Sequence, residues 1–412
     1  MIEKLYWRSG ESNSPIVILV SRGLDKEERA SLLHDVDEFC KELRPIEEVC
    51  YVEHTFNEQL IPLCRKYNLL GIPVRKEYGG RGADSLTYAR ALARIGMEGT
   101  GIRTFFSGHT SIGQVPIQSW GNEEQRKRYL PPSTKGEKIL AFGLTEPEAG
   151  SNPLEMKMIY HEEAGNYVLN GVKYLISNAG IAHAIVTFAY PKAGGRVSAF
   201  IVDTDKEGIL KQDLTTKLGM STVNTALFEL HDYPVPKENM LGKEGDGFKI
   251  AMSTLMSGRL SVAAGCVGVI ADCLNEIVRY SKERSQHGKP IAKHQLVQEH
   301  IAMVRTELDA AMCLVYKSAR AKNAYDADPT NAKVRAYADR LIAEGKFYAS
   351  NAAWDAADRA VQVFGGRGFS YLFRPGRHLM DVRVCRLYEG TDEIMKLKIA
   401  SAVLGKEYEA YR

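Results

Sequence analysis

Hydrophobic residues change their spacing twice along the 412-residue chain, and these changes constrain the fold most. From Asp25 to about Leu130 the spacing is helical. Asp25 and Glu28 fit a capping box at the start of this zone, and Asn57 and Asn122 are candidate caps of later helices. One face of the first helix collects apolar residues: Leu32, Val36, Phe39, Cys40 and Leu43. The chain is therefore expected to begin with a helical domain that ends near the prolines 131–132.

From Ala141 the pattern alternates and becomes rich in β-branched residues, which predicts strands. Further strands are expected at 184–189, 197–202 and 226–231. Asn170-Gly171 lies between two short apolar runs, 167–169 and 172–176, and this dipeptide accepts the positive φ angles of a type I′ turn. The sequence therefore predicts a hairpin centred on Asn170-Gly171.

Helical spacing returns after residue 247, with long helices expected at 248–284, 295–321 and 331–363 and a last one at 392–403. The predicted fold class is therefore α+β with three domains. These are an N-terminal α-helical domain (1–135), a central β-barrel-like domain (136–242) and a C-terminal four-helix bundle (243–412).

Composition narrows the class of protein. A net charge of +3 with scattered basic residues does not indicate nucleic-acid binding. Seven cysteines without CxxC spacing indicate neither a disulfide framework nor a zinc site, and they suit a reducing compartment. The early apolar run Pro15–Val20 is too short to span a bilayer, and Glu3 and Glu11 do not suit an organellar transit peptide. We expect a cytoplasmic protein without a membrane span.

Several common catalytic signatures are absent from the sequence. The chain has no GxGxxG opening a βαβ unit, no GxxxxGK[ST], no HExxH and no GxSxG elbow. Dinucleotide-binding Rossmann, nucleotide triphosphatase, metalloprotease and serine-hydrolase chemistry therefore lack support, and no metal is expected. Carboxylate chemistry beside an organic cofactor remains.

The segment from Arg386 to Ile394 offers such a carboxylate. Glu389 is followed by Gly390 and Thr391, so a substrate could lie against the backbone while the Glu389 amide stays free to donate. The alternative is an ordinary surface helix cap.

A second segment, Ala141 to Pro153, occurs far upstream. The two segments together resemble the acyl-CoA dehydrogenase family: Ala141 to Pro153 resembles its flavin-cradling loop, and Arg386 to Ile394 resembles its catalytic-base loop. Shorter matches follow the same order: Asn170-Gly171, residues 284–288, Gln295 and residues 362–366. The resemblance implies FAD as cofactor and α,β-dehydrogenation of an acyl-CoA thioester to the trans-2-enoyl-CoA, with Glu389 removing the α-proton while the β-hydride passes to the flavin. It also implies that the Glu389 amide holds the thioester carbonyl.

The resemblance assigns further residues to the site. Positions matching flavin contacts are Phe142, Leu144, Thr145, Ser151, Leu175, Ser177, Thr391 and Glu393. Positions that reach a neighbouring subunit's flavin in the family are Arg284, Gln286, His287, Gln295, Gln362 and Gly366. Positions expected near the acyl-CoA are Ser151, Arg259, Gly390, Arg103 and Thr104. Ordinary strand packing is the alternative for the first set, and solvated or salt-bridged helix arginines are the alternatives for Arg284 and Arg259.

Two positions bear on the base and on the substrate. Some relatives carry the base at the position matching Gly258, and glycine cannot abstract a proton, which favours Glu389. Relatives acting on glutaryl-CoA have an arginine followed by serine at the position of Arg103 and Thr104. A short acyl group with a polar or carboxylated end is therefore one hypothesis, and a structural salt bridge of Arg103 is the alternative.

The chain departs from the family pattern at Glu148, Asn152, Leu175 and His287. Leu175 stands where a flavin-shielding tryptophan is common, so an acyl-CoA oxidase or enoyl-CoA reductase on the same fold stays open. A flavin-free scaffold and a monooxygenase or nitroalkane oxidase are further alternatives. The partners that the resemblance implies are an electron-transferring flavoprotein and further copies of the chain, as a homotetramer or homodimer.

Overall fold

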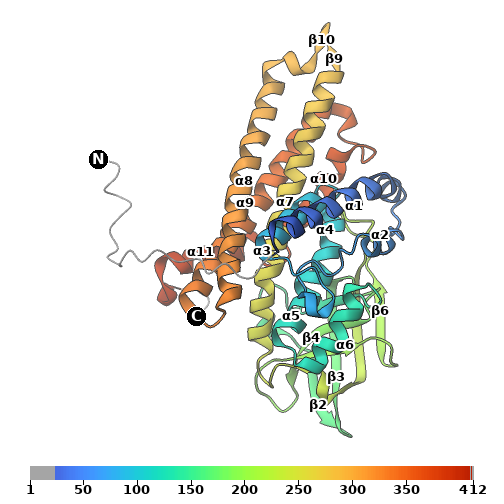
Figure 1. The fold of residues 1–412 in the computed structure, drawn as a ribbon, viewed down its shortest axis with the longest axis vertical. Helices are drawn as coiled ribbons and strands as arrows, with labels where there is room; N and C mark the ends of the chain where they lie inside the picture. The colour runs from blue at the N-terminus through green and yellow to red at the C-terminus, as the bar shows by residue number, and fades with distance from the viewer. Residues whose placement is uncertain (1–23, 409, 411–412) are drawn as a thin grey trace.

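A computed structural model describes residues 24–408 and residue 410. Pro15–Val20, Glu3 and Glu11, on which the expectations about membrane span and transit peptide rest, lie outside the described residues. The described chain forms a helical N-terminal part, a β domain and a helical C-terminal part, in the predicted order (Figure 1).

The N-terminal part begins with the predicted capping box, since the Asp25 carboxylate accepts from the Glu28 amide and the Glu28 carboxylate accepts from the Asp25 amide. The apolar face from Leu32 to Leu43 is fully buried, as expected. Asn122 caps its helix, whereas Asn57 accepts from the Gln59 amide just before α2 and is not the cap itself. The helices are α1 (Lys26–Glu53), α2 (Leu60–Lys66), α3 (Ser85–Gly96), α4 (Thr100–Phe106), the π-helix η2 (Ser107–Gln114), α5 (Val115–Trp120) and α6 (Glu123–Thr134).

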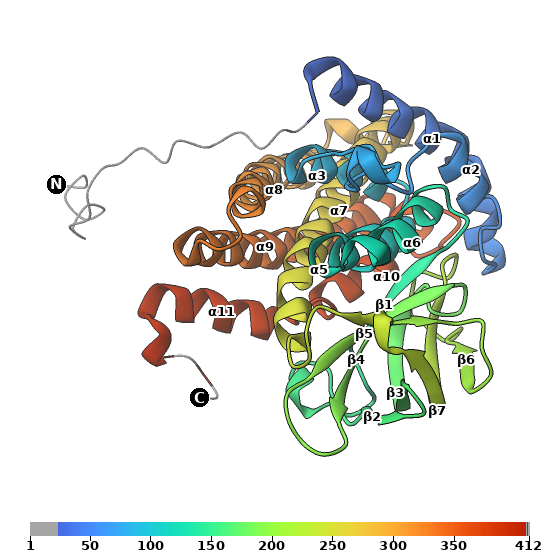
Figure 2. The ribbon, with the colours of Figure 1, turned by 60° about the horizontal axis from the view of Figure 1, so that its bottom comes forward.

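The β domain is one mixed sheet with the strand order β6-β7-β3-β2-β4-β5-β8, and β1 pairs in parallel with β4. Its strands are β1 (Leu140–Gly143), β2 (Ile159–Glu163), β3 (Asn166–Ser177), β4 (Ala184–Pro191), β5 (Ser198–Asp203), β6 (Ile209–Asp213), β7 (Thr225–Pro236) and β8 (Met240–Leu241). It lies beneath the N-terminal helices in Figure 2.

The hairpin expected at Asn170-Gly171 is wrong. β3 runs through both residues and pairs with β2 and β7, while the β2–β3 turn falls at Ala164 and Gly165, both with positive φ. Gly171 instead marks a register shift, where an added Cβ would lie 2.8 Å from the Met158 Cα. Long-range pairing of a twelve-residue strand has overridden the local turn preference.

The C-terminal part is built from three long helices, α7 (Gly247–Glu283), α8 (Gln295–Ala327) and α9 (Ala332–Phe364). They pack against one another, and α10 (Arg374–Val382) and α11 (Asp392–Leu404) pack on α9. The short strands β9 (Ser285–Gln286) and β10 (Lys289–Pro290) form a hairpin at the far tip of the bundle (Figure 1). α7 is long and apolar enough to cross a membrane, but 78% of its most apolar window is buried, as in a core helix.

Candidate active site

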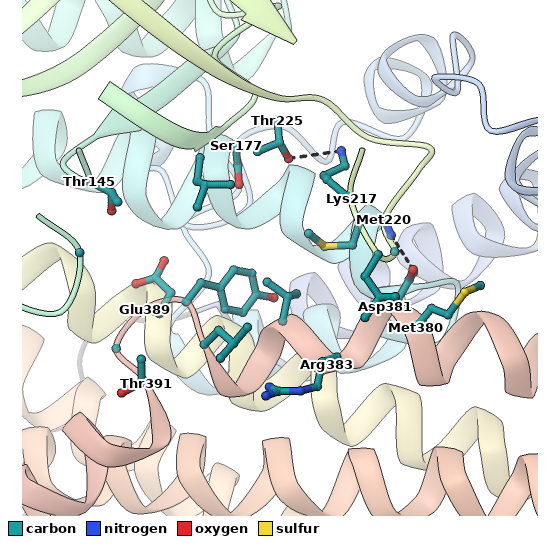
Figure 3. Close-up of a pocket in the computed structure, with 18 of the residues that line it drawn as sticks. Thr145, Ser177, Lys217, Met220, Thr225, Met380, Asp381, Arg383, Glu389 and Thr391 are labelled. Carbon is teal, nitrogen blue, oxygen red and sulfur yellow. Dashed lines mark hydrogen bonds between the residues drawn. The ribbon is translucent and has the colours of Figure 1, made fainter. Parts of the chain in front are cut away.

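A cavity of about 520 Å³ lies between the β domain and the C-terminal helices. Residues predicted for the site line it from both sides: Thr145, Ser151, Leu175, Ser177, Glu389, Gly390 and Thr391. In Figure 3, Thr145 and Ser177 project from the β domain towards the side that carries Glu389 and Thr391. Segments more than 200 residues apart in the sequence thus meet at one cavity.

The β-domain wall is held by backbone pairing and by one buried ion pair. Thr145 follows β1, and its carbonyl accepts from the Tyr174 amide at 2.9 Å. The fully buried Lys173 donates to the Glu146 carboxylate at 2.7 Å and to the Leu144 carbonyl at 3.2 Å. Burial lowers the pKa of Lys173 to about 8. This pair ties the loop after Thr145 to β3.

Leu175 occupies an irregular position in β3, with φ +58° and 54% of its surface exposed. Leucine rarely takes this left-handed conformation, so the surrounding strand pairing must hold it there. The consequence is an apolar side chain on the cavity wall.

Glu389 follows a short 3₁₀ helix, η7 (Arg383–Arg386), and has φ +57°. Among residues 24–408 and 410 its Oε2 is buried and has no hydrogen-bond partner. Burial raises the pKa of this carboxyl to about 7, against the lowering effect of Arg259, Arg103 and Lys346. Within the described chain its amide donates to no acceptor. A desolvated carboxylate and a free amide beside it are what a proton-abstracting site requires.

Arg259 lies behind the Glu389 turn rather than on the cavity wall. Its Nε donates to the Glu389 carbonyl at 2.9 Å, and its Nη1 lies 3.6 Å from an Asp339 carboxylate oxygen. Burial lowers the pKa of this guanidinium. The structure therefore gives Arg259 contacts with the base loop and with one helix carboxylate.

Arg103 and Thr104 lie behind Tyr388, whose side chain lines the cavity. Arg103 is 1% exposed, donates to the Tyr388 hydroxyl, and leaves its Nε without a partner. The Thr104 hydroxyl lies 3.3 Å from the same oxygen. Within the described residues Arg103 has no carboxylate partner, so the expected structural salt bridge is wrong.

Sequence reasoning missed two parts of the cavity lining: the loop from Lys217 to Met220 between β6 and β7, and the residues Met380, Asp381, Arg383 and Val384 of α10 and η7. The Met220 amide donates to the Asp381 carboxylate at 2.6 Å, and the Lys217 ammonium donates to the Thr225 hydroxyl at 3.4 Å (Figure 3). The same ammonium group also donates to the Val223 carbonyl at 2.7 Å. An added Cβ on Gly219 would lie 2.7 Å from the backbone of Met380. In the sequence, the signal for this contact was Gly219 inside a polar linker, and a glycine alone does not indicate which helix packs against it.

Other predicted residues lie away from this cavity. Phe142 and Leu144 are buried in the apolar cluster where the β domain meets the N-terminal helices and α7, and Glu393 is exposed on α11. The residues expected to reach a neighbouring subunit are exposed at the far end of the bundle, around β9, β10 and the ends of α8 and α9: Arg284, Gln286, His287, Gln295, Gln362 and Gly366. These six residues therefore lie near one another at the tip of the bundle, and they do not line the cavity of their own chain.

The lining suits a flavin ring beside an acyl thioester. Apolar side chains of Leu175, Leu218 and Leu387 offer surface to a planar ring, and the hydroxyls of Thr145 and Ser177 offer donors to its polar edge. The unpartnered carboxylate of Glu389 faces the same space.

Comparison with known proteins identifies the family. Three family descriptions match in order: Acyl-CoA dehydrogenase, N-terminal domain (26–137), middle domain (141–233) and C-terminal domain (245–404). An acyl-CoA dehydrogenase of Bacillus subtilis is 38% identical over 89% of this chain and 94% of its own length.

Two solved structures extend the likeness to three dimensions. Butyryl-CoA dehydrogenase from Megasphaera elsdenii matches with TM-score 0.86 and 32% identity, covering 93% of this chain and all of that one. An acyl-CoA dehydrogenase complexed with FAD from Bacillus anthracis matches with TM-score 0.85 and 31% identity, over 93% of this chain and 68% of that one. The chain belongs to the acyl-CoA dehydrogenase family and is a FAD-dependent oxidoreductase that dehydrogenates acyl-CoA thioesters.

Proposed function

We propose that Glu389 is the base that removes the α-proton of the acyl-CoA. The observation that supports it is the carboxylate itself: it belongs to a half-buried side chain on the cavity wall, its Oε2 is enclosed and has no hydrogen-bond partner among the described residues, and its pKa is raised to about 7. When bound, FAD would supply the acceptor for the hydride that leaves the β-carbon. The Glu389 amide is free to donate to the thioester oxygen, on which charge develops as the proton leaves.

The remaining wall residues hold cofactor and substrate in this proposal. Thr145 and Ser177 would donate to the flavin ring, Leu175 would cover one of its faces, and Ser151 and Gly390 would border the thioester. Phe142 and Leu144 would support the flavin through the backbone, with Thr391 and Glu393 as further contacts. The exposed group at the bundle tip would complete the flavin site of a second copy, so the active form would be a homotetramer or homodimer.

Anaerobic titration with acyl-CoAs from butyryl to palmitoyl, plus glutaryl and isovaleryl, tests the base. Bleaching of the flavin by one chain class, abolished in Glu389→Gln and retained in Glu238→Gln, is the expected result. Glu238 is an exposed carboxylate in the β domain and controls for the substitution itself. Full bleaching in Glu389→Gln would reject Glu389 as the base.

A short acyl group with a polar or carboxylated end is favoured by Arg103. A fully buried guanidinium without a carboxylate is costly, and a substrate carboxylate would offset that cost. Tyr388 separates Arg103 from the cavity. For Arg103 to bind the substrate carboxylate directly, the Tyr388 side chain must move aside; otherwise the Tyr388 hydroxyl, which Arg103 binds, must contact the carboxylate in its place. A glutaryl-coenzyme A dehydrogenase structure in complex with glutaryl-CoA matches this chain with TM-score 0.86 and 31% identity.

Turnover of glutaryl-CoA against butyryl-CoA separates the two substrate classes. We expect Arg103→Met to lower glutaryl-CoA turnover more than butyryl-CoA turnover. Higher activity on butyryl-CoA in the unchanged protein would reject the carboxylated substrate.

Enoyl-CoA reduction is the second candidate reaction. It is kept because Leu175 would cover the flavin ring with an aliphatic side chain at a position where the family commonly has a tryptophan. A relative named acryloyl-CoA reductase (NADH) is 36% identical over 88% of this chain. For the dehydrogenase direction we propose an electron-transferring flavoprotein as acceptor, in the cytoplasm. Flavin that no saturated acyl-CoA reduces, but that an enoyl-CoA reoxidises, would favour the reductase.

A further inference from the structure

Lys346, in the middle of α9, is a fully buried lysine that has no close carboxylate within the part of the chain that the structure describes. Its Nζ donates to the Gly390 carbonyl at 2.7 Å, whereas the Asp392 Oδ1 lies 4.0 Å away. Asp392 is bound instead by Arg386 at 2.8 Å and by Asn351 at 3.0 Å. Burying an ammonium group costs free energy, and no tight ion pair offsets that cost here. The short bond to a backbone carbonyl is therefore the main interaction of this charge.

The carbonyl that Lys346 binds belongs to a strained turn. Glu389 and Gly390 both have positive φ, +57° and +95°, and a residue with a side chain rarely keeps that conformation unless its surroundings hold it. Arg259 donates to the Glu389 carbonyl at 2.9 Å. Cations from α7 and α9 thus bind two successive carbonyls, which fixes the turn from the bundle side and leaves the Glu389 side chain on the cavity side.

We infer that Lys346 is a positioning residue for the reaction: its ammonium group holds the Gly390 carbonyl and thereby keeps the Glu389 carboxylate and amide turned into the cavity. The inference rests on the proposed role of Glu389. Lys346 also acts through charge, since it is one of three cations in the described chain that lower the pKa of Glu389, with Arg259 on α7 and Arg103 on α4. These cations favour the carboxylate form, which counteracts desolvation.

The test replaces the ammonium group in two ways. Lys346→Met removes donor and charge at similar length, and Lys346→Arg keeps both. Lys322→Met is the matched control, because Lys322 is another buried lysine, on α8, paired with Asp326 and not on this cavity. The measurements are the pH profile of kcat/KM, hydrogen–deuterium exchange of residues 387–391, flavin content and thermal melting.

We expect Lys346→Met to lower kcat/KM at pH 7 by about tenfold to hundredfold, as for a misplaced catalytic group. The apparent pKa of the acid limb should rise, and the amides of residues 387–391 should exchange faster. Lys346→Arg should recover most of the rate and the unshifted profile. Lys322→Met should change neither.

Two results would overturn the inference. One is a Lys346→Met protein with an unshifted pH profile and unchanged exchange at 387–391. The other applies if Lys346→Met does not fold. It is a well-folded Lys346→Arg protein that keeps the charge and yet shows a raised apparent pKa and faster exchange at 387–391, with Lys322→Met unchanged. Either result leaves the base assignment untouched, because that assignment fails only if Glu389→Gln remains active.

Discussion

The Glu389 carboxylate lies directly against Gly258 of α7, where an added Cβ would stand 2.5 Å from each carboxylate oxygen. The helix α7 thus presents a glycine, which has no side chain, to the proposed base. The base has the space it occupies only because position 258 is glycine.

Gly258→Ala should therefore move the base while leaving the helix intact. Alanine favours a helix interior over glycine by roughly 1 kcal/mol, so melting should not fall unless the contact strains the helix. We expect kcat/KM to drop by about tenfold to hundredfold, because the carboxylate must shift to admit the methyl group. Ser257→Ala, one residue earlier on the same helix, should keep the rate. Unchanged kinetics in Gly258→Ala would show that Glu389 works from another position.

The raised pKa of Glu389, about 7, sets the pH dependence of proton abstraction. Only the carboxylate form accepts a proton, so kcat/KM should rise tenfold per pH unit below about 7 and level off above it. Anaerobic stopped-flow flavin reduction between pH 5.5 and 8.5 measures the profile. A rate that stays constant down to pH 5.5 would contradict a desolvated base.

His109, in the π-helix η2, is hydrogen-bonded to Leu140, the first residue of β1. Its Nδ1 accepts from the Leu140 amide at 3.0 Å and its Nε2 lies 3.1 Å from the Ser133 carbonyl, so the buried ring is a neutral tautomer with the proton on Nε2. His109→Phe would leave the buried Leu140 amide without its acceptor, and we expect a loss of about 1–3 kcal/mol in unfolding free energy. His231→Gln, at an exposed histidine, is the control. Denaturant unfolding at pH 7.5 measures both.

Acid should narrow the difference between the wild type and His109→Phe. Burial lowers the pKa of His109 to about 4, below about 6.5 for an unfolded histidine. Between these values the unfolded chain takes up a proton that the folded chain does not, so the wild type loses stability as pH falls. This contribution amounts to about 3 kcal/mol when complete near pH 4 and is absent from His109→Phe. A stability difference that is constant from pH 7 to pH 4 would contradict the buried neutral ring.

The buried pair of Lys173 and Glu146 should support both folding and flavin uptake. Glu146 also accepts from the amides of Lys157 and Met158, so Lys173→Met would leave a buried, partly satisfied carboxylate. We expect destabilisation by about 3–5 kcal/mol and loss of flavin on purification. The double variant Lys173→Met/Glu146→Gln should regain part of the stability, because it removes both charges. A double variant that is no more stable than Lys173→Met would show that the ion pair does not account for the loss.

Local signals in the sequence determined the elements that depend on neighbours along the chain. The Asp25–Glu28 capping box, the buried face from Leu32 to Leu43 and the long helices α7 to α9 follow from spacing of three and four residues, which a helix satisfies within itself. The Glu389-Gly390-Thr391 motif singled out three residues that the structure places on the cavity wall.

Only the tertiary structure decided which distant residues serve that base. Because β3 pairs with β7, it continues as a strand through Asn170-Gly171. The packing of α7 and α9 brings Gly258, Arg259 and Lys346 into contact with the turn that contains Glu389. From the sequence alone, a lysine in a helical stretch is interpreted as a solvated charge. The structure shows that Lys346 is buried, because α9 packs against the Gly390 turn. Local preferences amount to tenths of a kcal/mol per residue, whereas burial of a charge or a long strand pairing is worth several, so the long-range contacts prevail where the two conflict.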